Sequence, residues 1–361
     1  MPFANLYDTM TLMDIKEQKI ADVFADVTKL DRSHEAVLFI EDGAGDFSYM
    51  LGYAGEDISS PFVLASVTKL FTTACVLTLR DQGRLRLDDR LGDYLDEAVL
   101  KGLHVFEGKE HAFDLTISAL LSHTSGLPDS FENEQTTTAS SIKKAFVEED
   151  AYFSFETHVA ETKSLSPCFA PGTPGRANYA NINYDLLGTV LENIMRQPLS
   201  EIYDDLIFRP LGLRDTYLPT NENDPVPGVR HEGELLRRPK VIISTRGFGG
   251  GIGSAQDLMV FIKAFWGGRL FNKDVFEELA RYAPLQKLMG PINYGIGYMQ
   301  IPLKGKQNAP TGGMELIGHS GVCSSFAYYC PAKALYFTGT LNQFAVSGLS
   351  TKLLTALARA L

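Results

Sequence analysis

The chain of 361 residues lacks any block of basic residues, and its formal net charge is −11. This acidic balance argues against nucleic acid or an anionic membrane as the main partner. No apolar run approaches the roughly 18 residues that a membrane-spanning helix needs. The opening stretch, MPFANLYDTMTLMDIKEQ, has no basic region followed by an apolar core, as a signal peptide would. We therefore expect a cytoplasmic protein with no nucleic-acid or membrane partner.

Cysteine and histidine are too few and too scattered for a metal or disulfide framework. The four cysteines have neither zinc-site spacing nor the density of a small disulfide scaffold. None of the seven histidines forms a His-x-x-x-His pair. We expect reduced thiols, mostly in the core, no metal site and no cofactor. The cysteines in question are Cys75, Cys168, Cys323 and Cys330.

Strand patterns lie near both ends of the chain, and helix patterns lie between them. An amphipathic helix is predicted over 14–30, and a strand, a turn at 42–45 and a second strand follow it. Near the C-terminus three strand patterns, MELIGHSG, SSFAYYC and ALYFTGTLN, precede a closing helix, LSTKLLTALARAL. The simplest assembly is one sheet built from both chain ends, with helices packed on it and a helical region inserted.

This pattern predicts one domain with two parts, because no Pro/Ser linker divides the chain. Residues 1–80 and 286–361 form the predicted sheet subdomain, and residues 81–285 form a mainly helical one. Thr116 is the predicted N-cap of the helix TISALLSH. Ser254 and Asp257 are predicted to form a capping box for SAQDLMVFIKAF.

The stretch LASVTKLFTTACVLTLRDQG reads as an apolar helix that Gly83 ends, and it carries Ser66 three residues before Lys69. Residues three apart share a helix face, so the two side chains can meet. One interpretation is an N-cap serine and a lysine that extends to water. The other is a serine nucleophile with a lysine base, which requires burial or nearby cations to lower the lysine pKa from about 10.4.

The same spacing occurs twice more, at Ser140–Lys143 and Ser141–Lys144. Both pairs lie in the polar stretch TTTASSIKK, which offers no apolar surroundings to lower a lysine pKa. We therefore favour Ser66–Lys69 as the candidate catalytic pair.

Two further motifs contain polar groups suited to a cleft. Tyr179 and Asn181 follow the Pro/Gly-rich loop FAPGTPGRA and precede a clear helix, although Asn181 or Asn183 is equally explained as an N-cap. His319, Ser320 and Gly321 lie on a predicted strand. Glycine in a strand marks either a bulge or close approach by a ligand or another backbone.

In chain order, Ser-x-x-Lys, Tyr-Ala-Asn and His-Ser-Gly resemble the three signature motifs of the serine β-lactamase and penicillin-binding protein superfamily. The branch that the chain resembles most contains class C β-lactamases, R61-type D-Ala-D-Ala carboxypeptidases and family VIII esterases. LLSHTSGLP (120–128), PLGLRDTY (210–217) and GGGIGSAQDLMVF (249–261) are also similar to stretches typical of it. The resemblance implies a β-lactamase/transpeptidase-like α/β (α+β) fold, with the active site between the antiparallel sheet and the helical subdomain.

The same resemblance implies a role for each motif residue. Ser66 would form the acyl-enzyme and Lys69 would accept its proton. Tyr179 would pass a proton to the leaving group and then activate water. Backbone N–H groups of Ser66 and Val322 would form the oxyanion hole. The implied substrate-binding residues are Asn181, His319, Ser320 and Gly321.

The third motif departs from the Lys-Thr-Gly that is typical of β-lactamases. Histidine has a free pKa of about 6.5, so it holds a carboxylate less strongly near pH 7 than lysine does. This departure favours a serine hydrolase for small esters or amides over efficient β-lactam hydrolysis. A penicillin-binding D-Ala-D-Ala carboxypeptidase or a class C-like β-lactamase is the first alternative. Substrate identity depends on loops near 127–150 and 218–245, and the sequence indicates no oligomeric state.

Three other classes of protein fit the sequence less well. GHSGV (318–322) comes close to the Gly-x-Ser-x-Gly of α/β-hydrolases, but it ends in valine and no strand–helix elbow follows. The glycine run at 247–253 lacks dinucleotide-binding spacing. A non-catalytic penicillin sensor would acylate at Ser66 and stop there, and the presence of Tyr179 with Asn181 speaks against it.

Overall fold

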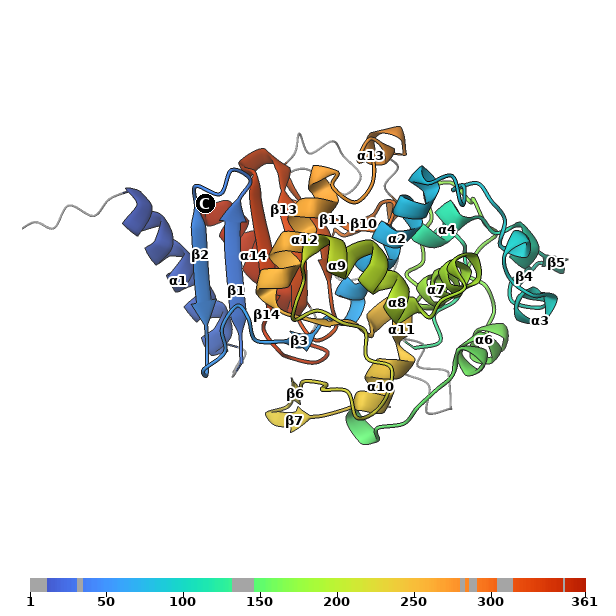
Figure 1. Cartoon of the computed structure of the whole chain (residues 1–361), viewed down its shortest axis with the longest axis horizontal. Coiled ribbons are helices and arrows are strands. Elements are labelled where there is room, and N and C mark those ends of the chain that lie inside the picture. Colours follow the sequence, from blue (N-terminus) through green and yellow to red (C-terminus); the bar gives the residue numbers. More distant parts are fainter. Residues whose placement is uncertain are drawn as a thin grey trace, which may run out of the picture.

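The computed structural model describes residues 12–30, 35–131, 146–279, 283–285, 291–303, 314–346 and 348–361. Within these ranges most strands of the chain lie toward its two ends, and most helices lie between them (Figure 1). The helices are α1 (Leu12–Leu30), η1 (Ala65–Thr68), α2 (Lys69–Asp81), η2 (Leu91–Asp93), α3 (Glu97–Leu100), η3 (Ala112–Asp114), α4 (Ile117–Leu121), α6 (Phe155–Lys163), α7 (Ile182–Met195), α8 (Leu199–Tyr203), η4 (Asp204–Phe208), α9 (Arg209–Leu211), α10 (Pro239–Ser244), α11 (Arg246–Gly249), α12 (Ala255–Gly267), α13 (Val275–Glu278), η5 (Pro331–Lys333) and α14 (Leu349–Ala360).

An antiparallel sheet of eight strands is built from both ends of the chain, in the order β2-β1-β14-β13-β12-β11-β10-β9. The pairing of β1 with β14 joins the N-terminal and C-terminal parts. The strands are β1 (Val37–Asp42), β2 (Ser48–Gly52), β3 (Phe62–Val63), β4 (Val105–Phe106), β5 (Lys109–Glu110), β6 (Val229–His231), β7 (Glu234–Leu236), β8 (Ile252–Gly253), β9 (Ala283–Pro284), β10 (Asn293–Tyr294), β11 (Met299–Pro302), β12 (Glu315–Ser320), β13 (Ser325–Cys330) and β14 (Leu335–Thr340).

The central strands are apolar at consecutive positions because helices cover both faces of the sheet. Along β1, Leu38 and Ile40 join the core that α1 and α14 complete, whereas Val37 and Phe39 join the core on the α12 side. The alternation follows from the period of two in a strand. α12 packs against β14, β1 and β13, and it lies in front of the sheet in Figure 1. This helix belongs to the range 81–285 in sequence and to the sheet layer in space.

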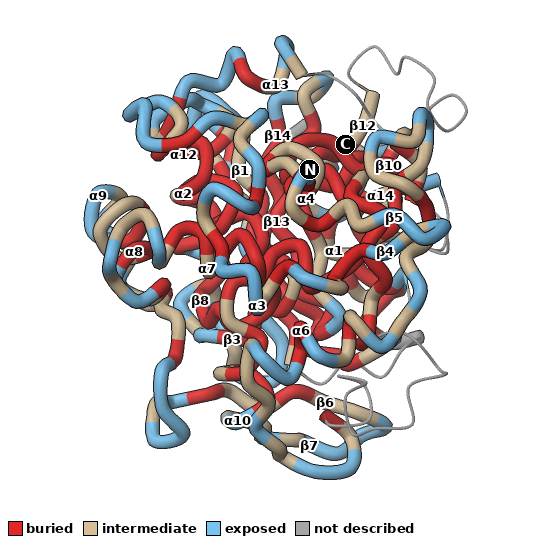
Figure 2. Tube along the Cα trace, turned by 90° about the vertical axis from the view of Figure 1, so that its right-hand side faces the viewer, coloured by how far each residue is buried: buried red, intermediate tan, exposed pale blue. Residues whose placement is uncertain are grey.

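The remaining helices form a second body beside the sheet. α7 is its centre and contacts α2, α4, α6, α8 and α11. Figure 2 shows buried residues through the middle of the molecule, whereas the β6–β7 hairpin and α9 lie at the periphery. The short turn η1 contacts β12, β13 and α11 together. It therefore lies where sheet and helical body meet, which is the place that the resemblance implies for an active site.

The predicted architecture is confirmed: an antiparallel sheet from both chain ends, flanked by helices, with a helical part beside it. The predicted helix over 14–30 is α1, and the predicted strands at both ends are present. The Thr116 hydroxyl accepts the N–H of Ala119, as an N-cap does. All four cysteines are free. Among the described residues, no helix has the length and apolar character to cross a membrane.

The capping box predicted at α12 is only half present. The Ser254 hydroxyl accepts the N–H of Asp257, as predicted. The Asp257 carboxylate accepts hydrogen bonds from the Asp215 N–H, at 2.8 Å, and from the Thr216 hydroxyl, at 2.9 Å. The carboxylate therefore joins the start of α12 to the segment after α9, a tertiary contact that the local pattern does not encode.

Candidate active site

Ser66 lies in a tight turn at the start of the α2 helix. β3 pairs with β8, and the Leu64 N–H donates to the Gly251 carbonyl, so the turn is fixed at its N-terminal side. Ser66 itself belongs to the 3₁₀ turn η1, and α2 begins at Lys69. In a 3₁₀ turn, residues i and i+3 eclipse one another, which brings the two side chains closer than an α-helix would. Ser66 is partly exposed.

Lys69 is fully buried and its amine has three oxygen partners. Its Nζ lies 3.1 Å from Ser66 Oγ, 2.8 Å from Asn181 Oδ1 and 2.7 Å from the Phe248 carbonyl oxygen. The Oδ1 atom of Asn181 and the backbone carbonyl oxygen of Phe248 can only accept, whereas the serine hydroxyl can also donate. A neutral Lys69 amine therefore donates to Asn181 and Phe248, and its lone pair is left for the Ser66 hydroxyl.

Tyr179 stands over this amine at the end of the 176–181 loop. Lys69 Nζ lies 4.9 Å from the centre of the Tyr179 ring. The ring packs on His123, with centroids 4.5 Å apart, and lies 6.2 Å from the His319 ring. Tyr179 is partly exposed, in contrast to its neighbours His123 and His319. The structure thus brings the predicted tyrosine beside the predicted Ser–Lys pair.

Asn181 precedes α7 but does not cap it with its side chain. Its Oδ1 accepts from Lys69, and its Nδ2 lies 3.4 Å from each carboxylate oxygen of Asp129. Asn181 is therefore the N-cap residue by position, but its side chain makes no capping hydrogen bond. The Asn183 side chain does not cap the helix either, because its amide binds the side chains of Ser125 and His123. The predicted contact of Asn181 with an acyl chain stays a prediction.

His319 is buried beneath Tyr179 and neutral at pH 7. Burial and the nearby Lys69 charge lower the pKa of His319 to about 3. Its Nδ1–H donates to the Ser320 carbonyl, at 2.9 Å, so Nε2 is free to accept from the Tyr294 hydroxyl, at 3.1 Å. The Ser320 hydroxyl lies 3.2 Å from the Tyr328 hydroxyl.

Gly321 directly follows β12 and lies against the backbone that carries Ser66. A Cβ atom at this position would lie 2.6 Å from the Leu64 carbonyl oxygen and 2.9 Å from Ala65 Cβ. The Ser325 hydroxyl donates to the same Leu64 carbonyl, at 2.7 Å. The β12–β13 turn therefore presses on the Ser66 turn, and glycine is required for the close approach. Val322, the predicted second oxyanion donor, is exposed just beyond this contact.

Two side chains that are not among the predicted site residues hold the Tyr179–Asn181 segment. His123 Nδ1 accepts the Ala180 N–H at 3.2 Å, and Asp129 Oδ1 accepts the Asn181 N–H at 3.1 Å. Burial lowers the pKa of His123 well below its usual range, and the charge of Lys69 adds to this effect. The signal was present: His123 lies in LLSHTSGLP and Asp129 directly follows it.

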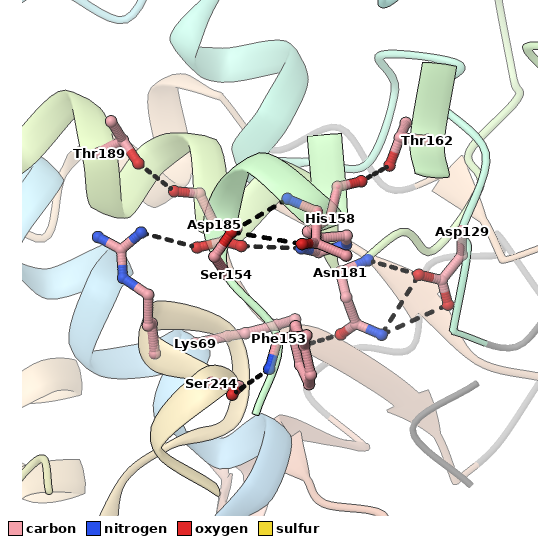
Figure 3. A network of polar contacts seen from close by, with 12 residues as sticks. Lys69, Asp129, Phe153, Ser154, His158, Thr162, Asn181, Asp185, Thr189 and Ser244 are labelled. Atoms are coloured by element: carbon pink, nitrogen blue, oxygen red, sulfur yellow. Dashed lines mark hydrogen bonds and ion pairs between the residues drawn. The ribbon is translucent and has the colours of Figure 1, made fainter. Parts of the chain in front are cut away.

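An ionic cluster around the buried Asp185 carboxylate anchors the start of α11 (Figure 3). The Asp185 carboxylate on α7 contacts His158 Nδ1, at 2.8 Å, and the Arg246 guanidinium, at 3.3 Å. Arg246 also pairs with Glu192, which lies about two turns after Asp185 on the same side of α7. Arg246 begins α11, which contains Phe248, so the cluster anchors the segment that accepts from Lys69.

The two alternative pairs, Ser140–Lys143 and Ser141–Lys144, lie outside the described residues. Among the residues that the structure does describe, no group of three or more His, Cys, Asp or Glu side chains is arranged to hold a metal ion.

The fold and this cluster define a protein of the β-lactamase/transpeptidase-like class. A family model described as Beta-lactamase matches residues 51–360, and the chain belongs to that family. It is therefore a member of the β-lactamase-like serine hydrolase superfamily.

Curated relatives match only part of the chain. The D-alanyl-D-alanine-carboxypeptidase/endopeptidase AmpH of Escherichia coli (strain K12) is 32% identical over 159 residues, which are 44% of this chain and 37% of that protein. Protein flp of Staphylococcus aureus (strain MW2) is 27% identical over 191 residues, which are 50% of this chain and 34% of that protein. The matches thus span little more than a third of these relatives' length.

Solved structures match almost the whole chain. A D-stereospecific amidohydrolase from Streptomyces sp. superposes with a TM-score of 0.76 at 23% identity, covering 96% of this chain and 98% of that one. D-amino acid amidase from Ochrobactrum anthropi SV3 has a TM-score of 0.75 at 18% identity, with the same coverage of 96% and 98%. At these identities the likeness establishes the fold alone.

Proposed function

We propose that this chain is a cofactor-free serine hydrolase that acts on small esters or amides through an acyl-enzyme on Ser66. The observation that carries the proposal is the set of contacts around Lys69. Its amine lies 3.1 Å from Ser66 Oγ, and its other two partners, the Asn181 and Phe248 oxygens, only accept hydrogen bonds. This arrangement directs the lone pair of a neutral amine at the nucleophile, as general-base activation requires.

The reaction would proceed in two halves. Lys69 takes the Ser66 proton while Oγ bonds to the substrate carbonyl carbon, and the oxygen of that carbonyl gains negative charge beside the N–H groups of Ser66 and Val322. Tyr179 gives a proton to the departing alcohol or amine, which leaves Ser66 acylated. Tyr179 then takes a proton from water, which attacks the acyl-enzyme carbonyl carbon. The bond from that carbon to Ser66 Oγ breaks, Lys69 returns its proton to Oγ, and the acid leaves with Ser66 and a neutral Lys69 restored.

The surroundings of His319 support a substrate without a carboxylate at this motif. His319 is fully buried, and its pKa of about 3 means that it carries no positive charge near neutral pH. Its ring nitrogens are already engaged with Tyr294 and with the Ser320 carbonyl. A neutral, committed imidazole offers little to the carboxylate of a β-lactam or of a peptide C-terminus.

We therefore expect kcat/KM for p-nitrophenyl acetate or butyrate to exceed that for nitrocefin by at least about tenfold, which is roughly 1.4 kcal/mol of transition-state preference. The same preparation should cleave a D-Ala-D-Ala peptide slowly or not at all. A D-amino acid amide belongs in the same panel, because solved structures named as amidases share the fold. Faster cleavage of the D-Ala-D-Ala peptide than of either ester would reverse the choice in favour of a carboxypeptidase.

We expect Ser66→Ala to abolish labelling by a fluorophosphonate probe, because Ser66 is paired with a buried lysine. Ser140→Ala and Ser141→Ala serve as matched controls and should label as the wild type does. Mass mapping of the adduct onto another serine would refute the assignment. A single burst equivalent of p-nitrophenol, with no further turnover, would instead identify a sensor that acylates and stops.

A further inference from the structure

Asp129 is a partly buried carboxylate on the far side of Asn181 from Lys69 (Figure 3). Its Oδ1 accepts the backbone N–H of Asn181 at 3.1 Å. The Asn181 Nδ2 lies 3.4 Å from both carboxylate oxygens. The Asn181 amide is thus held between a carboxylate at its nitrogen end and a lysine amine at its oxygen end.

We propose that Asp129 is a positioning residue for Lys69 that acts through the Asn181 amide; the inference rests on the proposed function of Ser66 and Lys69. An ionised carboxylate only accepts hydrogen bonds. Only the NH₂ end of the Asn181 amide can therefore face Asp129, and this leaves the Oδ1 end for Lys69. The orientation of the amide is set by a residue that does not itself contact the nucleophile.

The amide orientation decides where the Lys69 lone pair points. With Oδ1 toward Lys69, both N–H groups of the neutral amine have acceptors, on Asn181 and on Phe248, and the lone pair faces Ser66. With the amide reversed, its NH₂ group would donate to the amine lone pair. The lone pair would then be unavailable to the Ser66 proton, so acylation would slow.

The charges around Lys69 give a second, measurable consequence. His123 and His319 are buried and their pKa values are lowered, so both are neutral near pH 7, and the rings of Tyr179 and Tyr184 also face the Lys69 amine. Asp129 itself faces Lys69 and His158, whose charges oppose the rise in its pKa that burial causes. A carboxylate here favours the ammonium form of Lys69, so its removal lowers the Lys69 pKa.

Asp129→Asn tests the proposal with little change in shape. In the variant, the amide oxygen of residue 129 still accepts the backbone N–H of Asn181. The new NH₂ group then faces the Asn181 side-chain amide, and it attracts the Oδ1 atom of Asn181 away from Lys69. We expect kcat for p-nitrophenyl acetate to fall at least about tenfold, the scale of loss when a reacting group is misplaced, with KM changed less than about threefold. The acid limb of the kcat/KM profile should move to lower pH.

Asp257→Asn is the matched control. Asp257 is also buried, its pKa is also raised by burial, and it also accepts a backbone N–H, from Asp215. It contacts Asp215, Thr216 and Ser254, and none of these three residues is among the hydrogen-bond partners given above for Lys69. We expect this variant to lose stability and to keep kcat within about twofold of the wild type.

A double-mutant cycle separates positioning from general support of the fold. In an Asn181→Ala background the amide is gone, so Asp129→Asn should reduce kcat by less than about a further twofold. If Asp129 only supports the loop, the two losses will multiply, and the proposal is overturned.

The ¹⁵Nζ signals of labelled lysines give a readout that does not need turnover. The Lys69 signal is assigned by its absence in Lys69→Ala. We expect its titration to move to lower pH in Asp129→Asn and to stay unchanged in Asp257→Asn. If the wild type acylates no ester, the proposed function fails, yet this titration still tests the link between Asp129 and Lys69. An unchanged Lys69 titration in Asp129→Asn would refute the link.

Discussion

Lys69 and Tyr179 differ in how the chain encloses them. Lys69 is fully buried and bonded to three partners, whereas Tyr179 is only partly buried and stacks on His123. Each is assigned a proton transfer, and general acid–base groups contribute about 10²–10⁴ in rate. We therefore expect the two side chains to contribute similarly to the rate, although Lys69 is enclosed by the protein and Tyr179 is partly exposed.

We expect Lys69→Met and Tyr179→Phe each to lower kcat for an ester by two or more orders of magnitude, because each removes a proton-transfer group. Tyr179→Phe keeps the ring that packs on His123, so its free energy of unfolding should stay within about 0.5 kcal/mol of the wild type. Stopped-flow hydrolysis and urea unfolding measure the two effects. A Tyr179→Phe enzyme with wild-type kcat would remove the tyrosine hydroxyl from the mechanism.

The candidate catalytic residues could be predicted from sequence because their spacing is local or their motif is short. Ser66 and Lys69 are three residues apart, and Tyr179 lies in a tripeptide pattern. The Phe248 carbonyl could not be predicted, because it is a backbone atom 179 residues from Lys69. Asp129 was equally hidden, since its importance arises from the fold that places it 52 residues away against Asn181.

At the scale of elements, a distant loop holds the segment that directly precedes α7. His123 and Asp129 accept the N–H groups of Ala180 and Asn181. The helix patterns predicted where α7 and α12 begin, because periodicity and caps are local signals. They could not predict that the Asp257 carboxylate binds Asp215 and Thr216, or that the Asn181 side chain makes no capping hydrogen bond.

The contact between the β12–β13 turn and η1 leads to a prediction about Gly321. In Gly321→Ala, the new Cβ would lie 2.4 Å from Ser325 Oγ and 2.6 Å from the Leu64 carbonyl oxygen, so the Ser66 turn must shift. Overpacking of this kind costs about 1–3 kcal/mol. We expect a lower melting temperature and a loss of at least about tenfold in kcat/KM, since misplaced groups react slowly.

Gly267→Ala is the matched control for this substitution. A Cβ at Gly267, the exposed last residue of α12, would meet nothing within 4 Å. Alanine in a helix is favoured over glycine by about 0.5–1 kcal/mol, so this variant should be as stable as the wild type or more stable, with unchanged activity. A Gly321→Ala enzyme with wild-type kcat/KM would show that the turn does not constrain Ser66.

On the scale of the whole molecule, the stability of the folded chain depends on pH, because the site contains buried histidines that are neutral in the folded state. Burial and the charge of Lys69 lower the pKa of both His123 and His319. In the unfolded chain a histidine has a pKa of about 6.5 and binds a proton below it. The unfolded state then binds more protons than the folded state, so the stability that neutral burial maintains is present above pH 6.5 and is lost as the pH falls.

For His319, the window of this loss extends from about pH 6.5 in the unfolded chain to the folded pKa of about 3. Between pH 6.5 and pH 5 the linkage amounts to about 1.6 kcal/mol, because the unfolded imidazole is half protonated at pH 6.5 and almost fully protonated at pH 5. We expect urea unfolding to show a steeper fall in stability with acidification in the wild type than in His319→Gln, which has no proton to bind.

The difference in stability between the wild type and His319→Gln reports the protonation of His319 without that of the carboxylates. Burial raises the pKa of Asp129 and Asp257, so their protonation adds stability as the pH falls, with the opposite sign. Both carboxylates are present in wild type and variant, and their contribution cancels in the difference. Parallel stability curves for wild type and His319→Gln between pH 7 and pH 5 would mean that the imidazole accepts a proton in the folded site. His319 could then hold a carboxylate, and the expected preference for esters over nitrocefin would lose its physical basis.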